Sequence, residues 1–536
     1  MLNKRNSASK LPNLAEAKTT KKIAFAWLGL VMLFIAMLAK QWLWSAQSPI
    51  ETNILKLLPI NQQDPVAEQA FESVSSNLSD KVVFVVTANK DEHAFAAASQ
   101  LEQDLTQTGL FAEVVGKVSA AQQSQWAAYY FDHRYQQLTA EQRDRLANQP
   151  QAQVQHVLQS LYNPFSGVTG QELASDPFLL FRDYLSQLTQ LSSAFVLDQG
   201  FLTTEFEEQK YILVSATLND SPYSLSAQQG VTDILSIEHL LAEQFGANTF
   251  HTGVLFYAQF GTESAKSEIS TIGLFSLLGV IILIVGVFRS AAPLSLALLS
   301  IGVGLLSALA LTTWIFGSVH LFSLVFGASL IGVSIDYAFH YLTERLAAGQ
   351  KWDSRKGLKH IFTAITMGLI TSLIGYLGML IAPFPGLQQL ALFSSIGLIA
   401  AYATVVAWYP VLAVKPSADR KLPGQWFWQQ WLTVWTKPAV KYGLPLTCLV
   451  AATLPLSNLH YDDDIRQLQA MPESLKQQEE FITQLSGLQS SQQMLVVTAA
   501  SDEALLQRLE ALDTQLKNWK SEGKIQGYQS LSQYLS

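Results

Sequence analysis

The sequence predicts an α-helical protein that crosses a membrane several times and carries an α/β domain outside that membrane. Of its 536 residues, 49% are hydrophobic and only 14% are charged, whereas about 25% are charged in an ordinary soluble domain. The mean hydropathy is positive, at +0.20. The apolar residues gather in seven runs, each near the roughly 20 residues that a helix needs to cross a bilayer. A long block of ordinary composition separates the first run from the second.

The same composition excludes several classes of protein. The net charge is −8 and no basic tract is long enough to follow a phosphate backbone, so no nucleic-acid partner is expected. The single cysteine, Cys448, excludes an internal disulfide framework and a four-cysteine zinc site. Apolar residues are abundant almost everywhere, which excludes a disordered chain.

Seven segments are predicted to span the membrane. The fourth contains the acid Asp336 well inside it, and the seventh is short and includes Lys441 and Pro445. The second, third, fifth and sixth segments contain no Asp, Glu, Lys or Arg. The predicted spans cover residues 23–43, 269–288, 291–316, 319–342, 361–381, 387–414 and 439–456.

The distribution of Lys and Arg predicts the orientation of these spans. Basic residues cluster before the first span, between the fourth and fifth, and between the sixth and seventh. Because Lys and Arg accumulate in cytoplasmic loops, we expect residues 1–22 and the linker 415–438 in the cytoplasm, and residues 44–268 and 457–536 outside. A cleaved signal peptide ending near residues 44–46 is the alternative for the N-terminus, although the apolar run is long for one.

The external block 44–268 is predicted to be an α/β domain. Residues 81–88 read KVVFVVTA and residues 211–218 read YILVSATL, both typical of buried strands. A third strand is predicted at 250–257. Helical patterns lie between these runs, and strands that alternate with helices indicate α/β layers. The helices are predicted at 92–108, 141–161, 177–191 and 226–245.

The linker between the sixth and seventh spans contains four tryptophans, Trp426, Trp428, Trp431 and Trp435. This pattern is typical of an interfacial helix that lies at the lipid headgroups. We interpret it as part of an aromatic belt rather than as a ligand site.

The chain contains an internal repeat. Residues 48–59 read SPIETNILKLLP and residues 460–472 read HYDDDIRQLQAMP, and a strand pattern ending in VVTA follows each of them, at 82–88 and 494–499. An amphipathic helix pattern comes after both strands. The repeat indicates that the seventh span corresponds to the first. Residues 457–536 are therefore predicted to begin a second external domain, which is incomplete.

The fourth span carries the candidate chemistry. A spacing of four places Ala328, Gly332, Asp336 and His340 on one helix face. Small residues allow close helix packing, so the acid is expected in a tight space lined by protein, with Tyr337 beside it. Membrane carboxylates of this kind carry protons, and a histidine titrates near neutrality. We interpret Asp336, Tyr337 and His340 as a proton relay; a permanently protonated structural Asp336 is the alternative.

Other polar features have simpler interpretations. Hydroxyl groups on the fifth span could support the relay, although Ser and Thr in membrane helices usually bond to their own backbone. They are Thr363, Thr366, Thr371 and Ser372. The run Asp462, Asp463 and Asp464 is more readily explained as a solvated start of the repeated domain than as a calcium site.

No motif predicts an enzyme. Residues 261–267 read GTESAKS, which lacks the glycine and the spacing of a phosphate-binding loop. Gly302 and Gly304 lie in a membrane segment and are interpreted as packing residues. HExxH, GxSxG and His/Cys clusters are all absent from the sequence. No catalytic residue, cofactor or metal is therefore expected.

With these residues assembled, the chain resembles the RND superfamily and, within it, the MMPL-type exporters. The resemblance covers nearly the whole chain and is closest to a Gram-negative group of predicted exporters linked to fatty-acid-like and aryl-polyene lipids. The GVSIDYAFHYLTER segment around Asp336 carries most of its specificity. Further matches are ETNILKLLP after the first span, TGVLFYAQF before the second, and TMGLITSLIGYLGML in the fifth with Pro410 in the sixth.

The resemblance implies a twelve-helix, proton-driven exporter of lipidic or hydrophobic compounds in a bacterial inner membrane, with periplasmic porter domains. It implies that Asp336 and Tyr337 form the family's proton relay and that a second such pair lies in a second repeat. The chain is thus expected to be truncated. Implied partners are protons, a lipid or hydrophobic substrate, membrane lipids, and a second copy of the chain or a periplasmic carrier.

Three alternatives stay open at this stage. The spans from the second to the sixth also resemble a sterol-sensing arrangement, which allows a lipid-sensing protein that transports nothing. A split-subunit system of the Sec-accessory type is a second alternative. An inactive fragment is the third.

Overall fold

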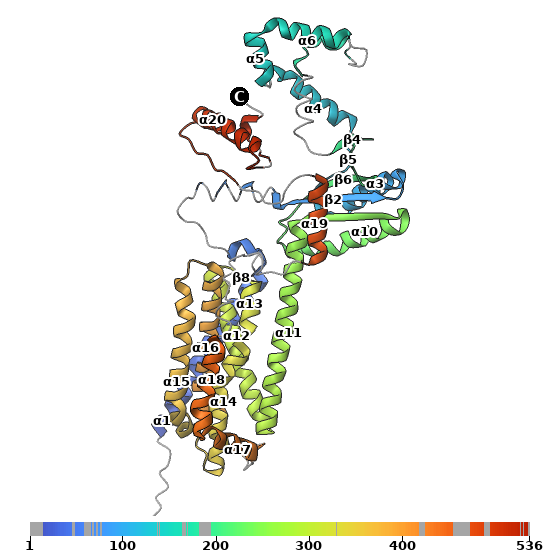
Figure 1. Cartoon of the computed structure of the whole chain (residues 1–536). Coiled ribbons are helices and arrows are strands. Elements are labelled where there is room, and N and C mark those ends of the chain that lie inside the picture. The colour runs from blue at the N-terminus through green and yellow to red at the C-terminus, as the bar shows by residue number, and fades with distance from the viewer. Residues whose placement is uncertain are drawn as a thin grey trace, which may run out of the picture. The chain divides into compact units, whose positions relative to one another are not determined.

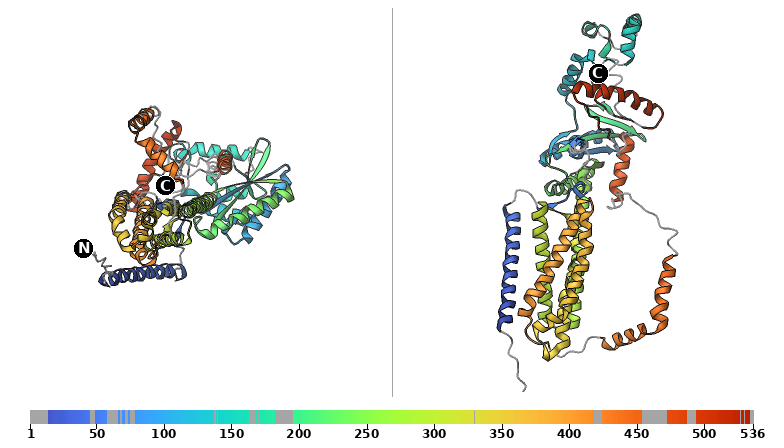
Figure 2. Two further views of the ribbon diagram at one scale, coloured as in Figure 1. Left: turned by 90° about the horizontal axis from the view of Figure 1, so that it is seen from below. Right: turned by 90° about the vertical axis from the view of Figure 1, so that its left-hand side faces the viewer.

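The computed structural model describes residues 14–44, 49–57, 78–136, 140–162, 170–181, 195–328, 330–417, 424–453, 472–486, 494–525 and 530–533, with a few single positions between them. They form two compact units. The helical unit comprises Met1–Ile60 and Phe260–Ala470, and the sheet unit comprises Asn61–Gln259 and Met471–Ser536. Figures 1 and 2 show the elements of both units.

Six helical segments in the described residues are long and apolar enough to cross a membrane. They confirm six of the seven predicted spans as apolar helices of sufficient length, and with them the predicted class of polytopic helical protein. The segments are Lys18–Trp44, Val254–Phe288, Ala291–Phe316, Leu321–Lys351, Ser354–Ile381 and Pro385–Leu412. The helices that form them are α1 (Leu14–Trp44), α11 (Val254–Phe288), α12 (Ala291–Phe316), α13 (Leu321–Ala328), α14 (Leu330–Ala348), α15 (Ser354–Gly378) and α16 (Pro385–Leu412).

The centre of the helical unit is the contact between α12 and α16, and small residues allow these helices to approach closely. A Cβ atom at Gly304 would lie 3.0 Å from the backbone oxygen of Gly397, which is the kind of backbone approach that glycine permits in membrane helices. Helix α1 packs against both. Trp27 Nε1 donates to Thr404 Oγ1 at 3.1 Å, and Trp408 Nε1 donates to the backbone oxygen of Ala24 at 3.0 Å.

The fourth predicted span begins as a short strand rather than as a helix. Its first two residues form strand β8 (Val319–His320), which pairs in parallel with β1 (Ile50–Glu51). Helices α13 and α14 follow and belong to one apolar segment, Leu321–Lys351, in which position 329 lies outside the described residues. The strand forms because the chain that leaves α1 offers β8 an extended partner, with Ile50 opposite Val319.

The Trp-rich stretch forms the predicted helix, α17 (Gln425–Trp435), in which no residue is buried. The described residues contain most of the seventh predicted span, which stays a prediction. Helix α18 (Pro438–Thr453) has 16 residues within the described part of the chain and contains Pro445. Residues 454–456 of the predicted span lie outside the described residues.

The sheet unit has a β-α-β-β-α-β order with antiparallel pairing throughout. Its central strands lie in the order β7-β2-β6-β3, which is the split βαβ arrangement of ferredoxin-like domains. The hairpin of β4 (Val196–Asp198) and β5 (Phe201–Phe206) pairs with the first half of β6, and β3 pairs with the second half. The six core elements are β2 (Lys81–Ala88), α3 (Asp91–Gln107), β3 (Phe111–Val115), β6 (Gln209–Leu218), α10 (Val231–Phe245) and β7 (Ala247–Gly253).

Alternation along β2 supplies both faces of this sheet. Val82, Phe84 and Val86 pack with α3 and α10. Val85 lies in a separate cluster with Ile482 of α19 (Glu473–Ser486), a helix from the C-terminal part of the chain. The strand predicted at 81–88 is therefore confirmed. Successive side chains of a strand point to opposite faces of the sheet, and the run is apolar throughout because both faces of β2 are covered.

Helices α4 (Ala120–Asp132), α5 (Ala140–Asn148), α6 (Pro150–Tyr162) and α7 (Gly170–Ser175) lie between β3 and β4 in the sequence. The helix predicted at 141–161 is two helices because Pro150 begins a new one, since proline favours the first turn and disrupts a helix interior. The helix predicted at 226–245 is likewise divided at Gly230 into α9 (Leu225–Gln229) and α10.

Three further expectations about elements need correction. The strand predicted at 250–257 ends at Gly253, where φ is +154°, and α11 begins at the next residue. Residues 494–499 form no strand, although helix α20 (Asp502–Ser521) follows them as predicted. The helix predicted at 177–191 does not begin at Pro177, because residues 177–179 are irregular and Leu179 has a φ of +51°. Residues 182–191 lie outside the described residues. The same is true of the acidic run Asp462, Asp463 and Asp464.

Candidate functional site

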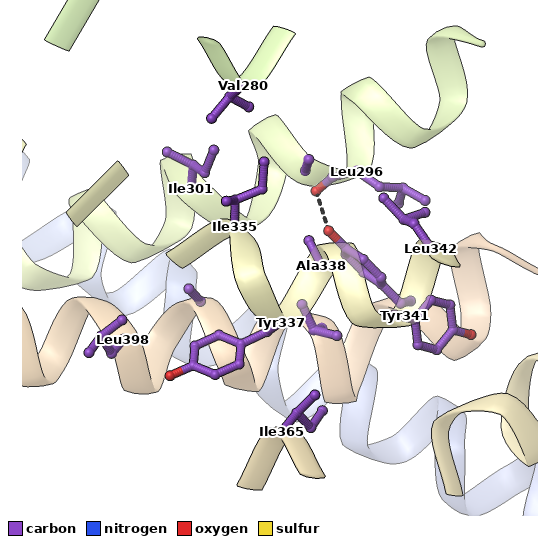
Figure 3. Packing of buried hydrophobic residues seen from close by; sticks show 14 of the residues in the cluster. Val280, Leu296, Ile301, Ile335, Tyr337, Ala338, Tyr341, Leu342, Ile365 and Leu398 are labelled. Carbon is purple, nitrogen blue, oxygen red and sulfur yellow. Dashed lines mark hydrogen bonds between the residues drawn. The ribbon is translucent and has the colours of Figure 1, made fainter. Parts of the chain in front are cut away.

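Helix α14 is held in the helical unit by one of its faces. Ile335, Ala338 and Leu342 are buried in the main apolar cluster. Tyr337 and Tyr341 are buried in the same cluster, on successive turns of α14 (Figure 3). Helices α12, α15 and α16 all contact α14. The buried face is therefore the one that contains the residues flanking Asp336, not Asp336 itself.

Asp336 is exposed among the described residues, and so are Gly332 and His340. The Asp336 carboxylate makes no hydrogen bond or ion pair with any described residue, and a Cβ at Gly332 would meet no atom of them within 4 Å. The predicted tight space around the acid is thus absent from the described structure. The spacing of four does place these residues on one face, but the neighbouring helices pack on the other. The side chain of Ala328 is not among those that the structure describes.

Tyr337 is the relay candidate that the structure buries, with 5% of its surface exposed. Its ring meets the ring of Tyr402, on α16, edge to face with centroids 5.7 Å apart and an interplanar angle of 85°. The Tyr402 hydroxyl in turn lies 2.7 Å from Thr366 Oγ1 on α15. The fold thus connects two of the predicted residues, Tyr337 and Thr366, through a third that the sequence analysis missed.

A sequence signal for Tyr402 did exist. Tyr402 and Tyr409 are seven residues apart in an apolar helix, which puts both hydroxyl groups on one helix face two turns apart. Thr371, by contrast, donates to the backbone oxygen of Gly368 at 3.0 Å, as the simpler interpretation expected. Thr363 is exposed. Of the hydroxyl groups on α15, Thr366 is the one that bonds a side chain of α16.

A second tyrosine pair anchors α14 one turn further along. The rings of Tyr341 and Tyr409 meet edge to face with centroids 5.3 Å apart. The Tyr341 hydroxyl donates to the backbone oxygen of Ser354 at 2.9 Å, and the Tyr409 hydroxyl donates to that of Leu296 at 2.7 Å. Figure 3 marks the bond accepted by Leu296. Both hydroxyl groups are satisfied, so this pair fixes the position of α14 against α12, α15 and α16.

The β1–β8 pair holds the start of α13. The His320 backbone N–H donates to Gln389 Oε1 at 3.0 Å, and its Nδ1 accepts from the backbone N–H of Phe322 at 3.2 Å. Burial lowers the pKa of His320 to about 4, against an opposing effect of the nearby Glu51 carboxylate. The imidazole is therefore neutral at pH 7. Burial raises the pKa of Glu51, but the hydrogen bond from Lys56 and two backbone N–H groups outweigh it and lower that pKa.

Charged groups in the sheet unit join α10, β7, α11 and α19. His251 Nδ1 lies 2.8 Å from Glu238 Oε1, and both side chains are largely buried. The Tyr257 hydroxyl donates to Glu479 Oε2 at 2.7 Å, and Gln478 Oε1 accepts from the His251 backbone N–H at 2.9 Å. In the part of the chain that the structure describes, no three His, Cys, Asp or Glu side chains form a group that could hold a metal ion.

Comparisons with known proteins place the chain in a family. A family model described as the MMPL family matches residues 67–440. Among solved structures, the X-ray structure of a heavy metal efflux pump matches with a TM-score of 0.38 and 11% identity, covering 83% of this chain and 52% of that one. The chain thus spans about half the length of that pump. No curated protein matches the chain.

The family model covers more than half of the sequence, including all of α11 to α17. It confirms the resemblance drawn from the motifs around Asp336 and Tyr337. The chain is accordingly a multi-pass membrane protein that belongs to the MMPL family.

Proposed function

We propose that this protein is a transporter, rather than an enzyme, that uses the proton gradient of a bacterial inner membrane to export a lipidic or hydrophobic compound. The observation that carries the proposal is Asp336, a carboxylate within an apolar helix that has no partner among the described residues. Tyr337, next to it in the sequence, is buried and supplies a hydroxyl group on the packed side of α14.

The energetics of an acid in a membrane support a proton-carrying role. An ionised Asp at the centre of a membrane helix costs about 2.5–3.5 kcal/mol on insertion scales. Such a group is readily driven between its charged and neutral forms by a change in its surroundings. Entry of one proton down the membrane potential releases about 2.3 kcal/mol per 100 mV, which is comparable with that cost. Protonation of the Asp336 carboxyl can thus be coupled to a change in helix packing.

The exposed face of α14 supports a second helix bundle as its partner in the working transporter. Gly332, Asp336 and His340 lie on this face, and the open space at Gly332 permits another helix to approach closely. A partner bundle would remove Asp336 from lipid and complete the space that the sequence analysis expected. His340 would then lie one turn from the acid, where its imidazole can exchange protons with it.

Other parts of the proposal follow from topology. Basic loops favour a cytoplasmic N-terminus, a cytoplasmic α17 at the lipid headgroups and a periplasmic sheet unit. The hydrophobic substrate is proposed from the family and from the membrane location. A second copy of the chain and a periplasmic carrier protein are the proposed protein partners, and no nucleic acid or cofactor takes part.

The proposal is tested by transport in liposomes that contain the full chain and carry a pH gradient. Fatty acid and lysophospholipid labelled with a nitrobenzoxadiazole group serve as probes. We expect gradient-dependent movement of a probe that Asp336→Asn abolishes. Glu479→Gln is the control, because Glu479 is an acid of the sheet unit that already accepts a hydrogen bond from Tyr257. Gradient-dependent movement at the wild-type rate in Asp336→Asn would show that the relay assignment is wrong.

A further inference from the structure

We propose that Glu344 and His360 form the cytoplasmic end of the proton path: protons that leave Asp336 pass along α14 to Glu344, and His360 releases them to the cytoplasm. This inference rests on the proposed function and deepens it, because it names the groups that carry the proton beyond His340. Its basis is a row of titratable side chains along α14 and the contact that joins the end of this row to α15.

The titratable side chains of α14 follow one slanting row. Asp336, His340 and Glu344 are separated by four residues each, and side chains at this spacing are neighbours whose Cβ atoms lie about 5–6 Å apart. The helix rises about 1.5 Å per residue, so the row extends about 12 Å from Asp336 to Glu344. Arg345, the remaining charged residue of α14, lies off this row, and its Nε donates to the backbone oxygen of Lys415 at 2.9 Å.

The row leaves the open face of α14 and reaches α15. Four residues turn an α-helix by about 400°, so each step lies about 40° further round the helix than the one before. Asp336 and His340 are exposed, whereas only 28% of the Glu344 side chain is exposed. Glu344 Oε1 lies 2.8 Å from Nδ1 of His360, on the second turn of α15. The slant therefore leads from the face that contains Asp336 to the side of α14 that contacts α15.

The partner of Glu344 is a histidine, which suits proton transfer. An imidazole takes up and releases protons near neutrality, whereas lysine and arginine stay charged there. The side chain of His360 is 73% exposed, so it can exchange protons with water beside the basic loop that predicts the cytoplasmic side. The other ion pairs among the described residues of the helical unit contain lysine: Lys56 with Glu51, Lys266 with Glu263, and Lys356 with Asp353.

One proton passes through this path and leaves its other members as they began. Asp336 gives its carboxyl proton to the neutral imidazole of His340 and becomes ionised. The imidazolium of His340 gives a proton to the Glu344 carboxylate, which passes it to the neutral imidazole of His360. The imidazolium of His360 then releases a proton to cytoplasmic water. Each step transfers one proton, and no bond between heavy atoms forms or breaks.

The experiment measures gradient-driven movement of the labelled lysophospholipid in liposomes that contain the full chain. His360→Lys keeps a cation beside Glu344 but removes the group that exchanges protons near neutrality. We expect it to lower the rate by about 10-fold or more, because a positioned proton-transfer group contributes about 100- to 10,000-fold to a rate. Glu344→Gln should lower the rate similarly, and Glu344→Asp should retain part of it. Lys356→Gln is the control at the wild-type rate, because it removes an exposed ion pair of 4.0 Å on the same helix.

Chemical rescue separates a proton-carrying role from a structural one. His360→Ala removes the imidazole at an exposed position, which imidazole dissolved in the buffer can reach. We expect His360→Ala to lose transport as His360→Lys does, and added imidazole to restore much of the lost rate. The same addition should leave the wild-type rate unchanged.

The outcomes separate this inference from the proposed function. Wild-type transport in His360→Lys, His360→Ala or Glu344→Gln, alongside loss in Asp336→Asn, overturns the cytoplasmic path and leaves Asp336 as the relay. An inactive His360→Ala that imidazole does not rescue shows that the pair only joins two helices, and it overturns the path as well. If Asp336→Asn transports at the wild-type rate, the proposed function is wrong and the path with it. Should His360→Lys fail to assemble, His360→Ala with and without imidazole decides the matter.

Discussion

Gly327 offers a sharp test of how α13 packs against α16. A Cβ atom at this position would lie 2.5 Å from Phe393 Cε1 and 3.0 Å from Phe393 Cδ1. Ordinary carbon contacts are about 3.5–4.0 Å, so the ring would have to retreat by about 1 Å. Phe393 is only 3% exposed, which leaves the ring little space. Gly327→Ala is therefore expected to destabilise the helical unit by about 1–3 kcal/mol, the usual cost of overpacking.

Gly368→Ala is the matched control for this substitution. Gly368 lies within α15, and a Cβ there would meet no described atom within 4 Å. The control should gain up to about 1 kcal/mol, because alanine favours a helix more than glycine does. Phe393→Leu combined with Gly327→Ala should recover part of the loss, since the smaller side chain removes the ring atoms that clash.

The assay is the equilibrium unfolding of the full chain in mixed micelles as sodium dodecyl sulfate replaces a mild detergent, followed by tryptophan fluorescence. The reasoning is refuted if Gly327→Ala is as stable as Gly368→Ala. It is also refuted if Phe393→Leu gives no recovery in the double variant, because the loss would then have another cause than the contact with this ring.

The other predictions concern His320, at the start of α13, and the packing of α19 on the sheet. The pKa of His320 is lowered to about 4 from 6.5, so the unfolded chain binds more protons between these values and stability should fall as pH falls from 6.5 to 4, by up to about 3 kcal/mol. His320→Gln should remove this dependence, and an unchanged pH profile in that variant would contradict the assignment. Phe481 lies with its ring 4.7 Å from that of Phe250, so Phe481→Ala should speed amide exchange in β7 about 30-fold, for a loss of about 2 kcal/mol. Phe427→Ala, an exposed ring of α17, should leave β7 protection unaltered, and equal exchange in both variants would show that α19 does not stabilise the sheet. The effect of Asp336→Asn on transport, stated above, completes the set.

Most elements of the fold were predictable because their signal is local. The membrane helices follow from apolar runs of sufficient length, and the strand at 81–88 follows from a short β-branched run before a helix pattern. The errors occurred where a partner decides the outcome. Residues 494–499 end in the same VVTA as β2, yet they form no strand, because a strand needs a neighbour to pair with and β2 has two, β6 and β7.

The sequence by itself determined the composition of the spans, the family, and the set of residues that share a face with Asp336, since helix periodicity depends only on spacing. The tertiary structure decided which face of α14 is covered. It buried Tyr337 and left Asp336 exposed among the described residues. It also brought Tyr402 and Thr366, 36 residues apart, into one hydrogen bond. The physical reason is that periodicity specifies relations within a helix, whereas contacts between helices depend on how α14, α15 and α16 pack together.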